Sequence, residues 1–337
     1  MSVPITISGW GVVSPAGWGV KPFMDALHQG KRPEVSEIQR PCGENTVSTS
    51  VFRVPTEGAT VPKSARLRRS SPISKFAAAA TVEALGEERL AAIREGKLRV
   101  GIIFTLLNGC VNYSHRFYSE VLADPAVASP ILFPETVFNA PSSHLSALLG
   151  SNSPNDTLIG DGAAFFSGLD LAAEWIGRGE VDGCLVVASE EIDWLSAEGL
   201  QLYERNAIAS EGAAAVYLEA GSGLANLLRL PDPIPLSRHS RAEAAAILRD
   251  ALAPAEGACL VDSRTGNAKL DAAEISAWHN WNGPRISPRA ILGEGLGVSA
   301  GWQFIAAAES IRSGNHTQAV VIATGANQQC AGAIVGR

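Results

Sequence analysis

The sequence of 337 residues has few cysteines, few charged residues and no long apolar run. Its five cysteines are scattered and form no Cys-x-x-Cys pair, which argues against a disulfide framework or a thiolate zinc site and favours a reducing compartment. Basic residues number 27 against 34 acidic ones, so no cationic surface for a nucleic acid is expected. No window reaches the roughly 18 uninterrupted apolar residues that a membrane-spanning helix needs, and the first residues do not resemble a secretion signal. We therefore expect a cytoplasmic protein that neither spans a membrane nor binds nucleic acid.

What the sequence does contain is a regular alternation of helical and β-prone segments. Hydrophobic residues make up 46% of the chain and glycines number 33, a composition typical of a compact α/β protein. Residues 74–94 have helical spacing and precede the β-branched run 99–105, and the same order returns with a helix over 163–177 and a strand over 183–189. Strands of this apolar kind are buried on both faces. The pattern predicts layers of helices and sheets.

An internal repeat indicates that the chain is duplicated. Residues 172–179 and 307–314 share the pattern AAExIxxG at an offset of 135 residues, and the strand that follows each copy keeps the same offset. A helix, a turn and a strand that stay in register favour duplication over chance. We predict two similar α/β halves, residues 1–225 and 226–337, packed as one unit.

Five segments, in this order, carry a resemblance to one known family. They are ITISGWGVVSPAGWGV (5–20), LFPETVFNAPSSHLSALLG (132–150), SEGAAAVYLEA (210–220), VDSRTGNAKLDAAE (261–274) and SPRAILGEGLGVSAGWQ (287–303). Together they resemble the β-ketoacyl-acyl carrier protein synthases, which have the thiolase fold. The resemblance spans nearly the whole chain and implies two duplicated halves in a five-layered αβαβα architecture.

The residues that perform condensation in that family are missing here. The family uses a cysteine at the N-terminus of a buried helix, where the helix dipole lowers the thiol pKa, and two histidines that promote decarboxylation. By motif, Gly162 occupies the cysteine position, Arg264 and Glu294 occupy the histidine positions, and Arg289 replaces a lysine. Residues 160–164 contain no cysteine or serine. The resemblance therefore implies a degenerate site and a chain that is not a condensing enzyme by itself.

The paired replacement of the two histidines suggests how the site is filled. Arg264 and Glu294 carry opposite charges at positions that face each other in the family. We hypothesise that they form an ion pair that closes the cavity, and that losing either partner is costly because it leaves a buried charge. The alternative is that both side chains point to solvent.

The resemblance implies a function of the chain-length-factor type. Such a subunit has no cofactor and pairs with an active ketosynthase in polyketide, aryl-polyene or fatty-acid-like biosynthesis, so that it meets the acyl carrier protein only indirectly. Residues 138–150 and 157–160 are expected to meet the partner. The candidate pocket or interface residues are Phe138, Asn139, His144, Asp161 and Phe165. The alternative is an acyltransferase-class enzyme that uses Asp161, Arg264 and Glu294 for decarboxylation or non-covalent acyl transfer.

Overall fold

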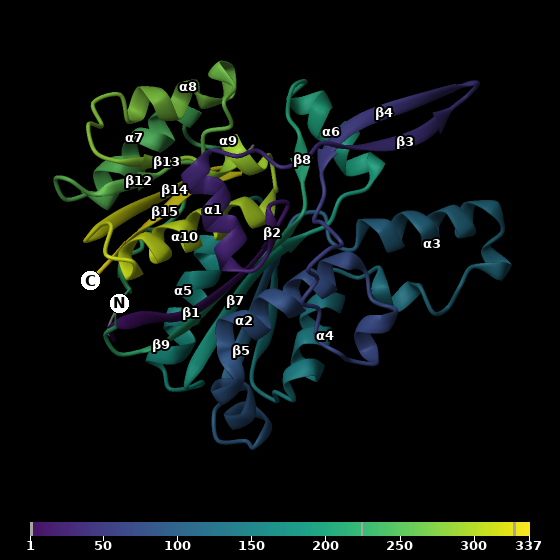
Figure 1. The fold of residues 1–337 in the computed structure, drawn as a ribbon, viewed down its shortest axis with the longest axis horizontal. Coiled ribbons are helices and arrows are strands. Elements are labelled where there is room, and N and C mark those ends of the chain that lie inside the picture. Colours follow the sequence, from purple (N-terminus) through teal and green to yellow (C-terminus); the bar gives the residue numbers. More distant parts are fainter. Residues whose placement is uncertain (1–2, 224, 326–327) are drawn as a thin grey trace.

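A computed structural model describes residues 3–223, 225–325 and 328–337, and within them a large mixed sheet organises the molecule (Figure 1). Its main path runs β13-β12-β14-β15-β10-β1-β9-β7-β5-β6, with β2 beside β1 and β11 beside β15. The strands are β1 (Ile5–Ser14), β2 (Gly17–Trp18), β3 (Ser36–Cys42), β4 (Asn45–Phe52), β5 (Val100–Leu106), β6 (Asn155–Ile159), β7 (Gly183–Glu190), β8 (Ala209–Ser210), β9 (Gly212–Ala220), β10 (Asn226–Arg229), β11 (Ile234–Pro235), β12 (Cys259–Val261), β13 (Arg285–Ile286), β14 (Gln318–Thr324) and β15 (Gln329–Gly336).

The main path consists of two strand sets with the same topology. Read outward from the β1–β10 contact, the sets are β1-β9-β7-β5-β6 and β10-β15-β14-β12-β13. In both sets the first two pairings are antiparallel and the next two are parallel. Strands β7 and β14 begin 135 residues apart, as the sequence repeat predicts. The duplicated α/β fold is therefore confirmed, whereas the division at residue 225 stays a prediction.

Helices fill the space between and outside the two strand sets. They are α1 (Val20–Gln29), η1 (Arg66–Arg68), α2 (Pro72–Arg94), α3 (Val111–Ala123), η2 (Pro125–Val127), η3 (Phe133–Glu135), α4 (Ala140–Leu149), α5 (Ala164–Gly177), α6 (Trp194–Tyr203), α7 (Arg241–Leu252), α8 (Ala268–Ala277), α9 (Pro288–Leu292) and α10 (Gly297–Arg312).

Three buried apolar clusters divide the molecule into five layers. One cluster joins α2 and α4 to the β1-to-β6 set, and another joins α7 and α8 to the β10-to-β13 set. The third and largest lies between the two sets and contains α5 and α10. Every residue of α10 is buried except Glu309 and Arg312, as expected for a helix that is apolar all round. The predicted αβαβα order is thus confirmed (Figure 1).

Two segments project from these layers on the side where β6 forms the edge of the sheet (Figure 1). One is helix α3 with the short helices η2 and η3 that follow it. The other is the β3–β4 hairpin, which pairs with β8 in a separate small sheet and contacts α6. Among the described residues, no helix has the length and apolar character needed to cross a membrane. Nor do the described His, Cys, Asp and Glu residues gather into a group that could hold a metal ion.

Candidate functional site

The turn between β6 and α5 keeps room for a side chain that the sequence does not supply. Gly162 lies immediately before α5, and the N–H of Ala163 donates to Oδ1 of Asp161 at 3.2 Å. A Cβ atom added at Gly162 would lie 3.5 Å from the Cβ of Ala300 and 3.7 Å from the carbonyl oxygen of Leu296, both ordinary contacts. The glycine is therefore not required by crowding. The turn has room for a nucleophilic side chain, but Gly162 has no side chain.

We expect a cysteine placed at this turn to be tolerated and reactive. In a Cys42→Ser background, Gly162→Cys should change the free energy of unfolding by less than about 1 kcal/mol, since the added atoms meet only ordinary contacts. The start of α5 should lower the pKa of the new thiol, so one thiol per chain should react with iodoacetamide at pH 7. The Cys42→Ser chain alone should stay unmodified, because the other four cysteines are buried. A folded variant whose new thiol stays inert would contradict the prediction.

A cavity of about 380 Å³ opens beside Gly162. Its walls come from α6 and the loop that follows it, from the segment after β12, from α9 and the start of α10, and from the end of β14. The polar side chains of the wall are Arg32, Asp161, Tyr203, Glu204, Asn206, Arg241, Ser263, Thr265, Asn267, Asp271, Glu274, Arg289, Glu294, Ser299, Gln303 and Thr324. The predicted site thus lies in an open cavity with a mixed polar and apolar lining.

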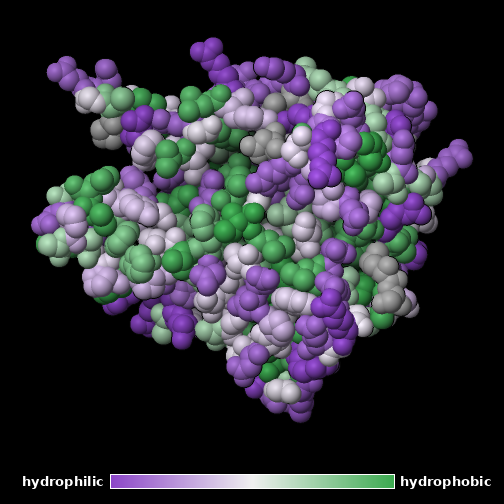
Figure 2. Space-filling view, turned by 180° about the vertical axis from the view of Figure 1, so that it is seen from behind, coloured by the Kyte–Doolittle hydropathy of each residue, from purple (hydrophilic) through white to green (hydrophobic). Residues whose placement is uncertain are grey.

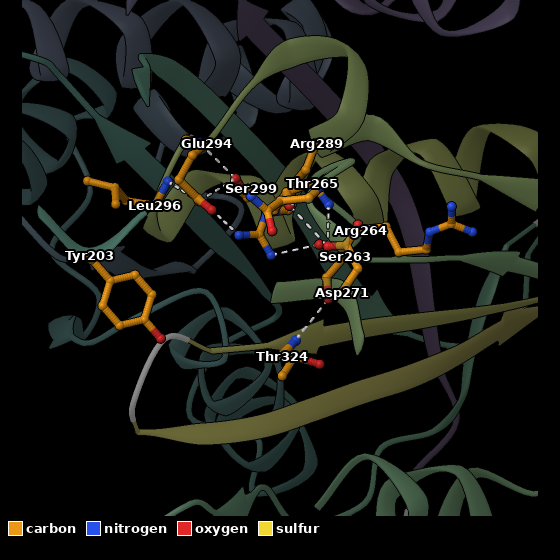
Figure 3. A network of polar contacts seen from close by, with 12 residues as sticks. Tyr203, Ser263, Arg264, Thr265, Asp271, Arg289, Glu294, Leu296, Ser299 and Thr324 are labelled. Atoms are coloured by element: carbon orange, nitrogen blue, oxygen red, sulfur yellow. Dashed lines mark hydrogen bonds and ion pairs between the residues drawn. The ribbon is translucent and has the colours of Figure 1, made fainter. Parts of the chain in front are cut away.

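The carboxylate of Glu294 is held by an ion pair with Arg289 (Figure 3). It also accepts hydrogen bonds from the N–H of Leu296 at 2.9 Å and from Oγ of Ser299 at 3.3 Å. Arg289 donates through Nη1 to the carbonyl oxygen of Ser263 at 2.9 Å. The two charged side chains are only 15% and 13% exposed, and burial lowers the pKa of the Arg289 guanidinium. This pair ties α9 to the segment after β12.

The predicted ion pair between Arg264 and Glu294 is wrong. Figure 3 shows the side chain of Arg264 directed away from Glu294. Its Nε atom is buried and has no hydrogen-bond partner among the described residues, and its backbone N–H donates to Asp262 at 3.3 Å. Arg289 pairs with Glu294 in place of Arg264. It lies on the same short segment as Glu294, five residues earlier, and reaches the carboxylate directly.

Two acidic residues that the sequence analysis missed complete the network. Asp271 accepts from the N–H and the hydroxyl of Thr265 at 2.9 and 3.0 Å and from the N–H of Gly266 at 2.9 Å. Glu274 accepts from the N–H of Ser263 at 3.1 Å and from its hydroxyl. The Asp-Ala-Ala-Glu run lies inside a segment that carries the family resemblance, so the signal was present. Both side chains brace the loop after β12 that carries Arg264.

Buried carboxyl groups should make the protein less stable as the pH rises. Burial raises the pKa of Glu274 to about 7 and that of Glu190, at the end of β7, to about 8. Both values lie above those of the unfolded chain, so the folded state binds protons more tightly. The stabilisation is full near pH 4 and is lost as the pH rises through these values. Urea unfolding should show the free energy of unfolding falling by roughly 7 kcal/mol between pH 5 and 9, at about 1.4 kcal/mol for each pKa unit. Glu190→Gln should flatten the slope above pH 7, and an unchanged slope would contradict the assignment.

The remaining candidate residues are divided between the surface and the core. Asp161 is buried in the cavity wall. Asn139 precedes α4, and the half-exposed ring of Phe138 lies over Gly109. His144 bonds through Nε2 to the carboxylate of Glu135 at 2.9 Å, outside the cavity.

Phe165 is fully buried and stacks edge-on against Phe166 and Phe304. Its prediction as a pocket or interface residue is wrong, because α5 belongs to the middle layer and turns this side chain into the core.

Comparison with known proteins identifies the fold. No protein-family model matches the sequence, and no curated protein matches it. Among solved structures, the ishigamide ketosynthase/chain length factor aligns over 99% of both chains with a TM-score of 0.81 and 17% identity. A type II polyketide synthase complex, AntDE:AntF, of an acyl-carrier protein with its ketosynthase bound to the hexaketide, aligns over 100% of both chains with a TM-score of 0.81 and 19% identity.

A third similar structure is the ketosynthase ApeO in complex with its chain length factor ApeC from Xenorhabdus doucetiae. It aligns over 99% of this chain and 98% of that chain, with a TM-score of 0.81 and 16% identity. At this level of identity the likeness establishes the fold. The chain thus has the thiolase-like fold that ketosynthases and chain length factors share.

Proposed function

We propose that this chain is a non-catalytic, chain-length-factor-like subunit that pairs with an active ketosynthase. The observation that carries the proposal is the turn at Gly162, which keeps its position before a buried helix and its free space but has no nucleophile. Around it, the positions that match the family's two catalytic histidines carry charged side chains that have no imidazole. Arg289 and Glu294 neutralise each other, and Arg264 turns away. Such a site is built to keep its shape and does not perform condensation.

The similar solved structures support a ketosynthase as the partner of this chain. Two of them are described as containing a ketosynthase together with a chain length factor, and a third contains an acyl-carrier protein bound to its ketosynthase. By analogy, the partner of this chain would hold the growing acyl group, and the carrier protein would dock on that partner. The product would be a polyketide, an aryl polyene or a fatty-acid-like chain. The five free thiols agree with a cytoplasmic location.

The open edge of the sheet supports β6 as the strand at which the partner binds. β6 pairs only with β5 in the sheet order. The N–H of Ile102 donates to the carbonyl of Pro154, and the N–H of Gly160 donates to the carbonyl of Leu106. Because groups alternate along a parallel ladder, the backbone groups of Asn155, Thr157 and Ile159 face outward, toward a possible further strand. Of these groups, the N–H of Thr157 donates to Oδ1 of Asp156 at 2.8 Å.

Apolar side chains surround this edge. We call β6 and the chain from the start of α3 to the end of α4 (residues 111–149) the partner face. Large apolar side chains on it that are exposed are Tyr118, Leu122, Val127, Ile131, Phe133, Val137, Phe138 and Ile159. In Figure 2, the α3 segment projects on the left and is coloured mostly green and white. An exposed apolar surface of this extent next to an unpaired strand is typical of a protein interface.

Co-expression with an intact, cysteine-bearing ketosynthase from the same organism tests the proposal. We expect a 1:1 complex that survives gel filtration. Condensation activity should be present in the complex and absent from this chain alone. Replacing the cysteine nucleophile of the ketosynthase should abolish the activity without dissociating the complex. Failure of the two chains to associate would contradict the proposal.

The open cavity favours a second candidate function. A volume of about 380 Å³ beside Asp161 and Gly162 is enough for a small acyl group. The chain would then act on an acyl thioester without a covalent intermediate. Turnover of malonyl or acyl thioester by the isolated chain, lost in Asp161→Asn, would favour this candidate over the first.

A further inference from the structure

The charges of the sequence are distributed unevenly around the partner face. Between residues 117 and 204 the only lysine or arginine is Arg178, and residues 117–177 contain none. The same stretch supplies the second half of α3 and all of η2, η3, α4 and β6, and Arg116 in the first half of α3 is the one lysine or arginine on the partner face. Acidic residues on this face are Glu120, Asp124, Glu135 and Asp156. The surface around the open strand is thus apolar and acidic.

Two of these acidic side chains, Asp124 and Asp156, are exposed and accept hydrogen bonds from backbone N–H groups. Oδ1 of Asp124 accepts from the N–H of Ala126 at 2.9 Å, and Oδ1 of Asp156 accepts from the N–H of Thr157 at 2.8 Å. Neither carboxylate has an ion pair with a described residue. Backbone N–H groups orient a carboxylate but leave its negative charge uncancelled. Asp156 lies on the open strand itself, where a partner strand would pass within a few ångströms.

The other two acidic residues are already paired within the chain. Glu120 bonds to Arg116 at 3.3 Å and accepts from the N–H of Ser129 at 2.9 Å. Glu135 bonds to His144. At the border of the face, Arg40 of the hairpin is engaged by Glu198. Arg116 and Arg40 are therefore bound to this chain's own carboxylates.

We infer that the partner face selects against a second copy of this chain and in favour of a different chain of the same fold with lysine or arginine on its matching face. This inference rests on the proposed function for the location of the face. In a twofold pair the same patch meets itself, so every acidic group would be doubled across the interface. Like charges brought together in this way cost free energy and reject the wrong partner, whereas opposite charges accelerate association.

Sedimentation of the isolated chain tests the first half of the inference. We expect the chain to be monomeric at micromolar concentration in 0.05 M NaCl. Self-association should strengthen at least tenfold in 0.5 M NaCl, because salt screens the repulsion while the apolar side chains remain exposed. A tight dimer at low salt, or one weakened by added salt, would overturn the inference.

A charge-reversed chain tests the second half without the natural partner. The Asp124→Lys, Asp156→Lys double variant presents the face that we assign to the partner. Mixed with the wild-type chain in 0.05 M NaCl, it should form a pair that weakens at least tenfold in 0.5 M NaCl. The matched control is Asp250→Lys, Glu256→Lys, which changes the net charge equally but lies in the outer layer far along the chain, on α7 and after it.

The outcomes separate this inference from the proposed function. If the control variant pairs with the wild type as well as the face variant does, net charge alone acts and the inference is wrong. The same double variant should bind the ketosynthase partner at least tenfold more weakly than the control variant does. Equal binding of the two variants would overturn the inference while leaving the proposed function in place. If the ketosynthase does not bind the wild-type chain at all, the proposed function fails.

Discussion

Thr157→Pro should weaken binding of the ketosynthase partner at least a hundredfold. The backbone of Thr157 faces the open side of β6, where its N–H donates to Oδ1 of Asp156, so proline removes this donor and places its ring in the path of a partner strand. The bonds from β6 to β5 are not touched, because they use the residues on either side. Affinity measured by surface plasmon resonance, or the yield of the complex in gel filtration, gives the result.

The matched control is Thr157→Ala. Both substitutions remove the contact of 3.1 Å between Oγ1 of Thr157 and Oγ of Ser142, but alanine keeps the N–H. The alanine chain should therefore bind the partner within about threefold of wild type, and the two variants should unfold at similar temperatures. If the proline chain binds as well as the alanine chain, the partner does not extend the sheet at β6.

The ion pair between Arg289 and Glu294 should show strong energetic coupling. In a double-mutant cycle with Arg289→Met and Glu294→Gln, the coupling free energy of unfolding should be about 3 kcal/mol, because either single change leaves one buried charge without its partner. Chemical denaturation of the four proteins measures it. The double variant should recover much of the stability that each single variant loses.

Arg264→Met combined with the same Glu294→Gln change is the internal control. Its coupling should be within about 0.5 kcal/mol of zero, because the two side chains point away from each other. A coupling as large as that of Arg289 would mean that Arg264 turns back toward Glu294 in solution. The two cycles share one variant, so the comparison depends on the arginine alone.

The repeated features of the fold could be predicted from the sequence because they leave periodic signals. Residues 172–179 and 307–314 repeat a helix end with its buried alanines, and that repeat fixed the two middle helices and the strands after them. The position of Gly162 followed from the same repeat. These predictions depend on backbone layout, which local sequence largely determines.

Side-chain pairing could not be predicted in the same way. Arg264 and Arg289 are both near Glu294 in the family pattern, and only the path of the backbone through α9 decides which guanidinium reaches the carboxylate. The burial of Phe165 depends on the rotation of α5 between two sheets, which a single helical repeat does not define. Asp271 and Glu274 lie in a segment that carries the family resemblance, but their burial was not expected because a carboxylate on a helix usually faces water.

The free space at the turn before α5 bears on how this chain and its active relatives can change into one another. Glycine and cysteine codons differ by a single nucleotide, and the backbone here would accept the thiol without rearrangement. A chance mutation could therefore restore the sulfur easily. What would still be missing is a pair of imidazoles, and regaining those requires dismantling a buried salt link that the loops now depend on. For a chain with the function proposed above, the barrier to gaining condensation activity lies in the surrounding loops, several substitutions away, and not in the missing sulfur.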